Sequence, residues 1–330
     1  MTRIVALSLL CAVAAAAGPS AGRARTLSVL ASFESDGRPA SQAVVPTRAQ
    51  LSVAIDGKPA TVESVSRVNA RANILLLVDL TWTATRGEHP AQAAAIAYLK
   101  RGLVPGGPYR SKPFPGFISG MDRAFLPLLG PSDDLYAGSF AGQRLSFSHA
   151  ATSSSADRLA AFSEVINPDV VPLADWYGPA RMWDAVAAGV TQFPTGAPFK
   201  SILLVTDGQA SGNRLGHSDA ITAAVAQGVV VHVICQKTWW DPTQAPSGDT
   251  FVRRLAEQTG GLIRIDDALD RDPWDKPARI FKDIVDAIHN TYEIRLVTVD
   301  VVEGIHALEV RTELPRLRVN APAWVQVRTP

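Results

Sequence analysis

The sequence LLLVDLTWTAT at residues 75–85 places the pattern of a buried strand directly before a carboxylate and a series of hydroxyls. The continuous apolar run Ile74–Val78 predicts a β-strand that is covered on both faces. Asp79 follows the run at once, and Thr81 and Thr83 follow it on the same loop. Two kinds of site begin in this way. One holds a divalent metal ion that grips a ligand, and the other uses the aspartate as a phosphate-accepting nucleophile.

Strand and helix patterns alternate along the chain on both sides of this stretch. Further strands are predicted at Leu135–Phe140, Ser201–Gly208, Gly228–Cys235 and Leu262–Ile265. Helices are predicted at Ala91–Arg101, Ala156–Ile166, Ala180–Val190, Asp219–Gln227, Thr250–Thr259 and Ala278–Tyr292. Repeated alternation of this kind predicts an α/β fold, with a doubly wound, mostly parallel sheet and helices on both of its faces.

The two flanks of this region have strand patterns without helices. Residues 25–70 contain alternating apolar and polar segments joined at Asp56-Gly57, a dipeptide typical of hairpin turns. Residues 293–330 return to the same patterning in the segments 293–301, 305–314 and 317–328. We therefore expect an α/β domain at residues 71–292, and a small β domain that both flanks build together.

Within the α/β domain, residues 103–133 are rich in glycine, proline and aromatic residues. This composition predicts an insertion loop. Cysteine and histidine patterns that would signal metal binding are missing, because the six histidines show no paired metal spacing and the chain has only two cysteines. One of these, Cys11, lies in the N-terminal segment, so we expect no internal disulfide, and Cys235 is expected to pack in a strand.

The N-terminal residues 1–24 have the pattern of an export signal. Arg3 supplies a positive start, Ile4–Ala17 is apolar, and small residues follow. The apolar stretch is shorter than a membrane-spanning helix requires, and no later stretch is long enough either. We therefore expect a secreted or periplasmic protein without a transmembrane segment after cleavage. The formal net charge of +1 and the scattered basic residues argue against nucleic acid as a partner.

A second aspartate occupies an equivalent place in the sheet. Asp207 ends the strand ILLVT just as Asp79 ends ILLLV. Ligands of open parallel sheets bind beyond the carboxyl ends of the strands, where both carboxylates should meet. Two buried carboxylates are costly unless a cation or hydrogen bonds satisfy them, and Mg²⁺ prefers such oxygen ligands. Capping of neighbouring loops or helix N-termini is the structural alternative for either aspartate.

Three motifs, at residues 79–83, 178–190 and 206–208, resemble those of the von Willebrand factor A domain in the same order along the chain. Asp79-Leu80-Thr81-Trp82-Thr83 corresponds to the Asp-x-Ser-x-Ser element of that family's metal-ion-dependent adhesion site, with threonine at both serine positions. Thr206-Asp207-Gly208 matches its Thr-Asp-Gly turn. Gly178–Val190 is similar to its second loop and helix, with Ala180 where a threonine is usual. The flanking order is similar to exported bacterial proteins described as von Willebrand factor A-related.

The resemblance implies a degenerate adhesion site at the carboxyl edge of the sheet. Its metal ligands would be Asp79, Thr81, Thr83 and Asp207, and its cofactor Mg²⁺, or alternatively Mn²⁺ or Ca²⁺. Threonine keeps the oxygen of serine but stiffens the side chain, whereas Ala180 removes one oxygen. Arg181 would compete with a metal ion if its guanidinium turned into the site, or else points to solvent.

Several aromatic residues fall on the loops at the same edge. Such residues are favoured in recognition surfaces because they supply large, rigid contact areas. Local packing over loops and helix ends is the alternative. We expect a ligand-binding rim that consists of Trp82, Trp176, Tyr177, Arg181, Trp239 and Trp240.

These features predict a binding protein of the adhesion type that holds a protein ligand, and not an enzyme. No general base or nucleophile is evident beyond the aspartates. One alternative is a phosphohydrolase of the haloacid-dehalogenase type with Asp79 as nucleophile, but its acid/base aspartate would be Thr81. Another is a structural module with an inert site, which Ala180 keeps open.

Overall fold

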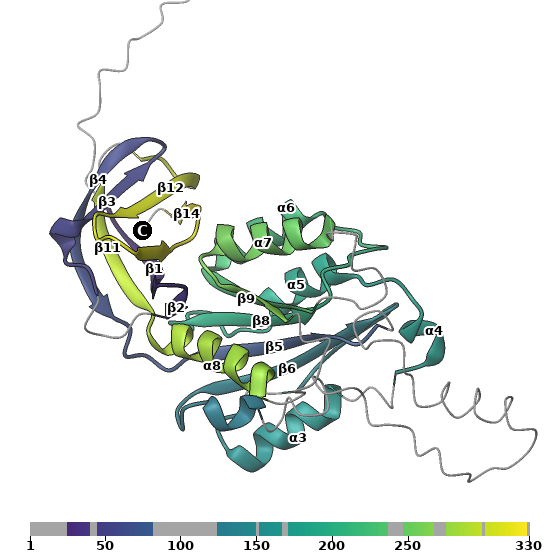
Figure 1. Cartoon of the computed structure of the whole chain (residues 1–330). Coiled ribbons are helices and arrows are strands. Elements are labelled where there is room, and N and C mark those ends of the chain that lie inside the picture. Colours follow the sequence, from purple (N-terminus) through teal and green to yellow (C-terminus); the bar gives the residue numbers. More distant parts are fainter. Residues whose placement is uncertain are drawn as a thin grey trace, which may run out of the picture.

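The computed structural model describes residues 25–39, 45–81, 124–149, 152–166, 171–236, 247–266, 275–298 and 301–328. It contains two sheets, one surrounded by helices and one without them (Figure 1). The predicted signal segment 1–24, the predicted helix Ala91–Arg101 and most of the predicted insertion loop lie outside the described residues. Within the described ranges, no helix has the length and apolar character needed to cross a membrane.

The first sheet has six strands in the order β10-β9-β8-β5-β6-β7. All neighbours are parallel except β7, which pairs antiparallel with β6. Numbered along the chain within this sheet, the order is 3-2-1-4-5-6, the order of doubly wound folds. Its strands are β5 (Asn73–Asp79), β6 (Asp134–Ala141), β7 (Arg144–Phe147), β8 (Lys200–Thr206), β9 (Val229–Gln236) and β10 (Ile263–Asp266).

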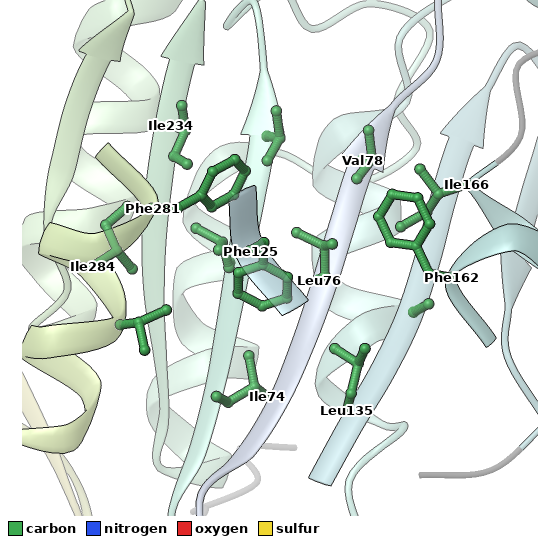
Figure 2. Close-up of a cluster of buried hydrophobic side chains, with 14 of the residues drawn as sticks. Ile74, Leu76, Val78, Phe125, Leu135, Phe162, Ile166, Ile234, Phe281 and Ile284 are labelled. Carbon is green, nitrogen blue, oxygen red and sulfur yellow. The ribbon is translucent and has the colours of Figure 1, made fainter. Parts of the chain in front are cut away.

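Helices cover both faces of this sheet, which explains the continuous apolar run of β5. Leu75 and Leu77 point into the core on one face, while Ile74, Leu76 and Val78 point into the core on the other. Figure 2 shows the second of these cores, where Phe125 and Phe281 pack over the strands. The helices are α3 (Ser155–Val165) and α8 (Asp275–His289) on that face, and α5 (Met182–Val190), α6 (His217–Gln227) and α7 (Ser247–Thr259) on the opposite face.

The chain passes from α7 into β10 through Gly260-Gly261, where only glycine fits. A Cβ atom on Gly261 would lie 2.0 Å from the carbonyl oxygen of Val231. The close approach lets β10 pair beside β9 immediately after the helix. The short elements that complete this half of the molecule are α4 (Leu173–Trp176) and the 3₁₀ turn η3 (Leu126–Leu128).

The second sheet is antiparallel and contains strands from both flanks of the chain. Its order is β13-β1-β11-β4-β3-β12-β14, with β2 paired to β1. Asp56 and Gly57 both have positive φ values at the turn between β3 and β4, where the sequence predicts a hairpin. The strands are β1 (Arg25–Ser35), β2 (Arg38–Pro39), β3 (Leu51–Ile55), β4 (Lys58–Arg67), β11 (Tyr292–Thr298), β12 (Gly304–Thr312), β13 (Leu317–Asn320) and β14 (Trp324–Val327), and the 3₁₀ turn η2 (Arg48–Gln50) precedes β3.

A buried ion pair ties the two sheets together. Arg264 of β10 donates to the Glu34 carboxylate of β1 at 2.6 Å and to Asp283 of α8 at 3.3 Å. The other carboxylate oxygen of Glu34 accepts from Asn320 Nδ2 at 3.0 Å. Glu34 is only 5% exposed. The Glu34 carboxylate therefore depends on Arg264, because a buried charge without its counterion is strongly unfavourable.

Three sequence predictions need correction in their extent. The last helix ends at His289 instead of Tyr292, because Tyr292 starts β11 and its ring packs on Phe33 at 5.4 Å. The end of the predicted loop 103–133 belongs to the core, since Phe125 is fully buried against Phe281. The predicted segment 317–328 forms two strands, β13 and β14, at opposite ends of the sheet order.

The Glu34 ion pair gives a prediction for stability. Replacing Glu34 with alanine should lower the free energy of unfolding by about 3 kcal/mol, because the partly buried Arg264 would keep only its longer contact with Asp283 and Asn320 would lose its acceptor. Urea unfolding followed by circular dichroism measures this change. Glu309→Ala, which breaks an ion pair exposed to solvent, is the matched control and should have almost no effect. Equal effects of the two substitutions would contradict the assigned role of Glu34.

Candidate functional site

The carboxyl ends of β5 and β8 form the candidate site. These adjacent strands are the point where the strand order reverses, and chain connections leave the sheet in opposite directions there. Such switch points carry the ligand sites of open α/β sheets, because the diverging connections leave a crevice. Strand β5 ends at Asp79, and β8 ends at Thr206 with Asp207 directly after it. The two carboxylates that the sequence singles out therefore meet at one edge.

Asp79 is 1% exposed and accepts hydrogen bonds on both carboxylate oxygens. Its Oδ1 accepts from the backbone N–H of Thr81 at 3.0 Å and from the Thr81 hydroxyl at 2.7 Å. Its Oδ2 accepts from the hydroxyl of Thr206 at 2.9 Å. The hydroxyls at positions 81 and 206 thus hold the carboxylate in a fixed orientation.

Asp207 lies beside it in the turn that follows β8. The carboxylate is 2% exposed, and its Oδ1 accepts from the backbone N–H of Gln209 at 2.9 Å. Gly208 has a positive φ of 79°, and its N–H donates to the Thr206 hydroxyl oxygen at 3.1 Å. Thr206 therefore links the turn to Asp79, since its hydroxyl accepts from Gly208 and donates to Asp79.

The electrostatics of Asp79 follow from this burial. Loss of solvent and the neighbouring Asp207 carboxylate raise the pKa of Asp79 to about 7, against the opposing hydrogen bonds from Thr81 and Thr206. Near neutral pH the pair therefore holds a proton for part of the time, because two adjacent buried carboxylates resist carrying two negative charges. A cation at the same place would favour the doubly charged form.

A second loop packs against the turn after Asp207. Ala180, immediately before α5, donates its N–H to the Ser211 hydroxyl oxygen at 3.2 Å and accepts from the Ser211 N–H at 2.9 Å. Asn213 Oδ1 accepts from the N–H of Trp183 at 2.8 Å, and so caps the exposed donors at the start of α5. The loops at 178–181 and 207–213 form one layer as a result.

Arg181 is held within this layer. Its guanidinium donates to Asp184 at 2.6 and 3.0 Å and to Gln143 Oε1 at 2.8 Å. Asp184 also accepts from the backbone N–H groups of Arg214 and Leu215. Although burial opposes it, these hydrogen bonds and Arg181 hold the pKa of Asp184 below its usual value. The geometry accounts for the Arg181 charge without an ion pair to Asp79.

The predicted binding rim loses one residue in the structure, and the binding role of the others stays a prediction. Trp176 is wrong as a rim residue, because its side chain at the end of α4 is fully buried and joins the core. Its neighbour Tyr177 is 45% exposed and stacks edge-on against it at 4.7 Å. The predicted ligand Thr83 and the predicted rim residues Trp82, Trp239 and Trp240 lie outside the described residues.

Two residues of the site were not predicted as such. The sequence offered Thr206 only as part of the Thr-Asp-Gly motif, and its alternation along β8 could have shown that its hydroxyl faces Asp79. Ser211 carries no sequence signal, because its place against Ala180 depends on how the following loop folds back.

The donor set consists of oxygen atoms only. Two carboxylates, Asp79 and Asp207, lie with the hydroxyls of Thr81 and Thr206. Hard divalent cations such as Mg²⁺ prefer such ligands and complete their shell with water. Among the described residues, no group of three or more histidine, cysteine, aspartate or glutamate side chains is placed to hold a metal ion. The residues fit a cation that takes hydroxyl and water ligands beside two carboxylates.

Comparisons with known proteins give distant structural matches. No protein-family model and no curated protein matches the sequence. A solved structure of the conserved hypothetical protein BatB from Bacteroides thetaiotaomicron is 16% identical, with 64% of this chain and 97% of that chain covered and a TM-score of 0.41. Proximal thread matrix protein 1 from the mussel byssus, with a zinc-occupied MIDAS motif, is 15% identical, with 70% and 47% covered and a TM-score of 0.41.

A third match is the SpRpn10 VWA domain, which is 11% identical, with 66% of this chain and 94% of that chain covered and a TM-score of 0.37. At these TM-scores the matches carry no conclusion about the site. The assignment rests on the strand order and on the residues at the switch point.

The raised pKa of Asp79 gives a prediction for pH dependence. In the presence of a chelator, Asp79 binds its proton more tightly in the folded chain than in the unfolded chain. Its pKa is about 7 in the folded chain and near 3.8 in the unfolded chain. Its contribution to stability should therefore be complete below pH 4 and should be lost as the pH rises to about 7. Urea unfolding at several pH values measures this loss.

Asp79→Asn is the comparison that isolates the effect, because asparagine keeps an acceptor but cannot titrate. Burial and Arg264 lower the pKa of His232 to about 3, so His232 adds stability as the pH rises towards 6.5 and acts in the opposite direction. The difference between the wild-type and Asp79→Asn curves removes that contribution. A difference that stays constant between pH 4 and 7 would contradict the assignment.

Proposed function

We propose that the chain is an exported binding module of the von Willebrand factor A type, which holds a protein ligand through a divalent cation at the carboxyl edge of its sheet. The observation that carries the proposal is the pair of buried carboxylates, Asp79 and Asp207, beside two hydroxyls at the switch point. The strand order and the three sequence motifs support the same reading.

The metal ligands in this proposal are Asp79, Thr81 and Asp207, with Thr206 orienting Asp79 through its hydroxyl. The predicted ligand Thr83 belongs to the same set. A bound Mg²⁺ would supply an open coordination position for an acidic group of the ligand, and charge to stabilise both carboxylates. Ala180 offers no side-chain oxygen, and its carbonyl already accepts from Ser211, so water would fill that position at lower affinity.

Binding without turnover is part of the proposal. The hydrogen bonds of Asp79 go to Thr81 and Thr206, and no second acid stands at position 81 to protonate a leaving group. This arrangement does not favour the haloacid-dehalogenase alternative. The contact surface would include Tyr177, which is exposed at the same edge, and export would follow from the signal pattern of residues 1–24.

A metal titration tests the proposal. Isothermal titration calorimetry of the chelator-treated chain with Mg²⁺ and Mn²⁺ should show one site, and the thermal unfolding midpoint should rise with metal concentration. Asp79→Asn and Asp207→Asn should each abolish both signals because each removes a charged ligand. Asp286→Asn, at a solvent-exposed ion pair on α8, is the matched control and should bind as the wild type does.

Absence of metal-dependent heat in the wild type would instead leave the inert module as the better reading. Turnover of p-nitrophenyl phosphate that disappears in Asp79→Asn would favour the hydrolase.

The departure at Ala180 gives a separate prediction. Ala180→Thr should raise the affinity for Mg²⁺ by about tenfold, since it adds the missing oxygen at the second loop. Ala180→Val has the same shape without the hydroxyl, so it should leave the affinity unchanged or lower it. Calorimetric titration of both variants measures the difference. Equal affinities for the two would show that position 180 does not face the metal.

A further inference from the structure

The second sheet is an incomplete roll with two free strand edges. Strand β1 pairs with β11 along Arg25–Ala31, but on its other side β13 covers only Ser32–Ser35. At the far end of the sheet order, β14 pairs with β12 alone. Among the described residues, no strand therefore lies beside the first half of β1 on the side away from β11, or beside the outer edge of β14.

The backbone groups of β1 that face this gap can be identified from the hydrogen-bond pattern. Val68 N–H donates to Thr291 O, which starts the ladder between β4 and β11. In an antiparallel strand, the N–H and C=O groups of successive residues point alternately to one neighbouring strand and to the other. The backbone groups of Tyr292 and Ile294 therefore point to β1, where they bond those of Ala31 and Val29. The N–H and C=O groups of Ser28 and Leu30 consequently point away from β11.

The same reasoning applies to β14. Leu308 N–H donates to Ala323 O, which fixes that pair as hydrogen-bonded. In the register of this ladder, Val325 and Val327 bond β12. The N–H and C=O groups of Trp324 and Gln326 therefore point away from β12.

Both edges line one cavity of about 350 Å³. Ser28 and Leu30 line it on one side, and Trp324 and Gln326 on the other. Much of its remaining wall comes from the starts of β8 and β9 and from the end of α6. The cavity lies at the amino ends of the parallel strands, so it is at the opposite end of the sheet from Asp79.

The cavity also carries an excess of positive charge. Lys200 lines it, and the side-chain ammonium makes no hydrogen bond or ion pair with any residue that the structure describes. Arg328 lines it too, and its guanidinium donates a hydrogen bond to the Ala226 carbonyl oxygen at the end of α6. The acidic residue Glu293 lies at the wall, but Arg295 already pairs with it at 3.3 Å. A carboxylate bound beside Lys200 would therefore form a favourable ion pair with its ammonium group.

We propose that this gap binds an extended acidic segment of a partner protein, which adds as a strand between β1 and β14. Its backbone would pair with the free groups of Ser28, Leu30, Trp324 and Gln326, as in other cases of strand addition. Alternate side chains would be apolar, because Val29 and Val325 on either side point into the core of the roll. A glutamate or aspartate on the opposite face would meet Lys200.

Charge complementarity favours a partner over the N-terminal segment of this chain. Residues 1–24 contain Arg3 and Arg23 but no aspartate or glutamate. That segment would bring further positive charge to a cavity that already holds Lys200 and Arg328. An acidic strand from another protein supplies the opposite charge.

Binding of a synthetic strand tests the proposal. The probe is the fluorescein-labelled peptide Thr-Val-Glu-Val-Thr-Val-amide, titrated with the full chain and followed by fluorescence anisotropy. Gln326→Pro removes one N–H that faces the gap while Val325 and Val327 keep their bonds to β12, and it should weaken binding at least tenfold. Gln326→Ala is its matched control and should bind as the wild type does.

The charge is tested separately. Lys200→Met should weaken binding of the glutamate peptide about tenfold, whereas Lys200→Arg should restore it. The peptide with glutamine for glutamate should bind more weakly and should not distinguish Lys200→Met from the wild type. Thermal unfolding checks that each variant folds, and Ser28→Pro, on the opposite edge of the gap, replaces Gln326→Pro if that variant does not.

Several results would overturn the proposal. These are no binding by the folded wild type at about 1 mM peptide, or unchanged affinity in the proline variant. A dimer in sedimentation that Gln326→Pro dissociates would assign the gap to a second copy of the chain. Binding only after removal of residues 1–24 would assign the gap to that segment.

Discussion

The two carboxylates buried side by side at the ends of β5 and β8 set the conditions for everything around them. Like charges in a medium that excludes water repel strongly, and parallel pairing of the strands leaves Asp79 and Asp207 no room to separate. The surrounding hydroxyls and backbone N–H groups offset part of that cost, and the rest raises the pKa of Asp79 to about 7. The residues around the turn after β8 hold both carboxylates in place: Thr206 orients that of Asp79, and the backbone N–H of Gln209 donates to that of Asp207.

The loop at Ala180 is held through its backbone. The N–H and the carbonyl oxygen of Ala180 both bond to Ser211. The alanine side chain takes no part in these hydrogen bonds, so they do not depend on which side chain stands at position 180. Asp184 and Arg181 form an ion pair inside the same layer, so the positive charge of Arg181 is balanced there.

The sequence predicted a mostly parallel α/β sheet and the position of the aspartate pair at strand ends, because both depend on local patterns. A run such as Ile74–Val78 has to be covered on both faces, and a carboxylate at its end has to lie at the sheet edge. Burial of Trp176 and Phe125 could not be predicted, because a large aromatic residue in a loop has the same local pattern whether it packs inward or outward. The split of residues 317–328 into β13 and β14 depends on pairing with β1 and β12, which are distant in sequence. Long-range pairing of this kind leaves no local signal.

The pairing of β4 with β11 has a consequence for the order of folding. These strands bring Arg67 and Tyr292 side by side, so the whole α/β domain is a loop between two neighbouring strands. Chains are synthesised from the N-terminus. Strands β1, β3 and β4 therefore lack most of their pairing partners until β11, β12 and β13 have been synthesised. The helical domain consists mainly of contacts closer in sequence, which form faster. It should therefore fold first, and its folding should bring the two flanks of the chain close together so that β4 can pair with β11.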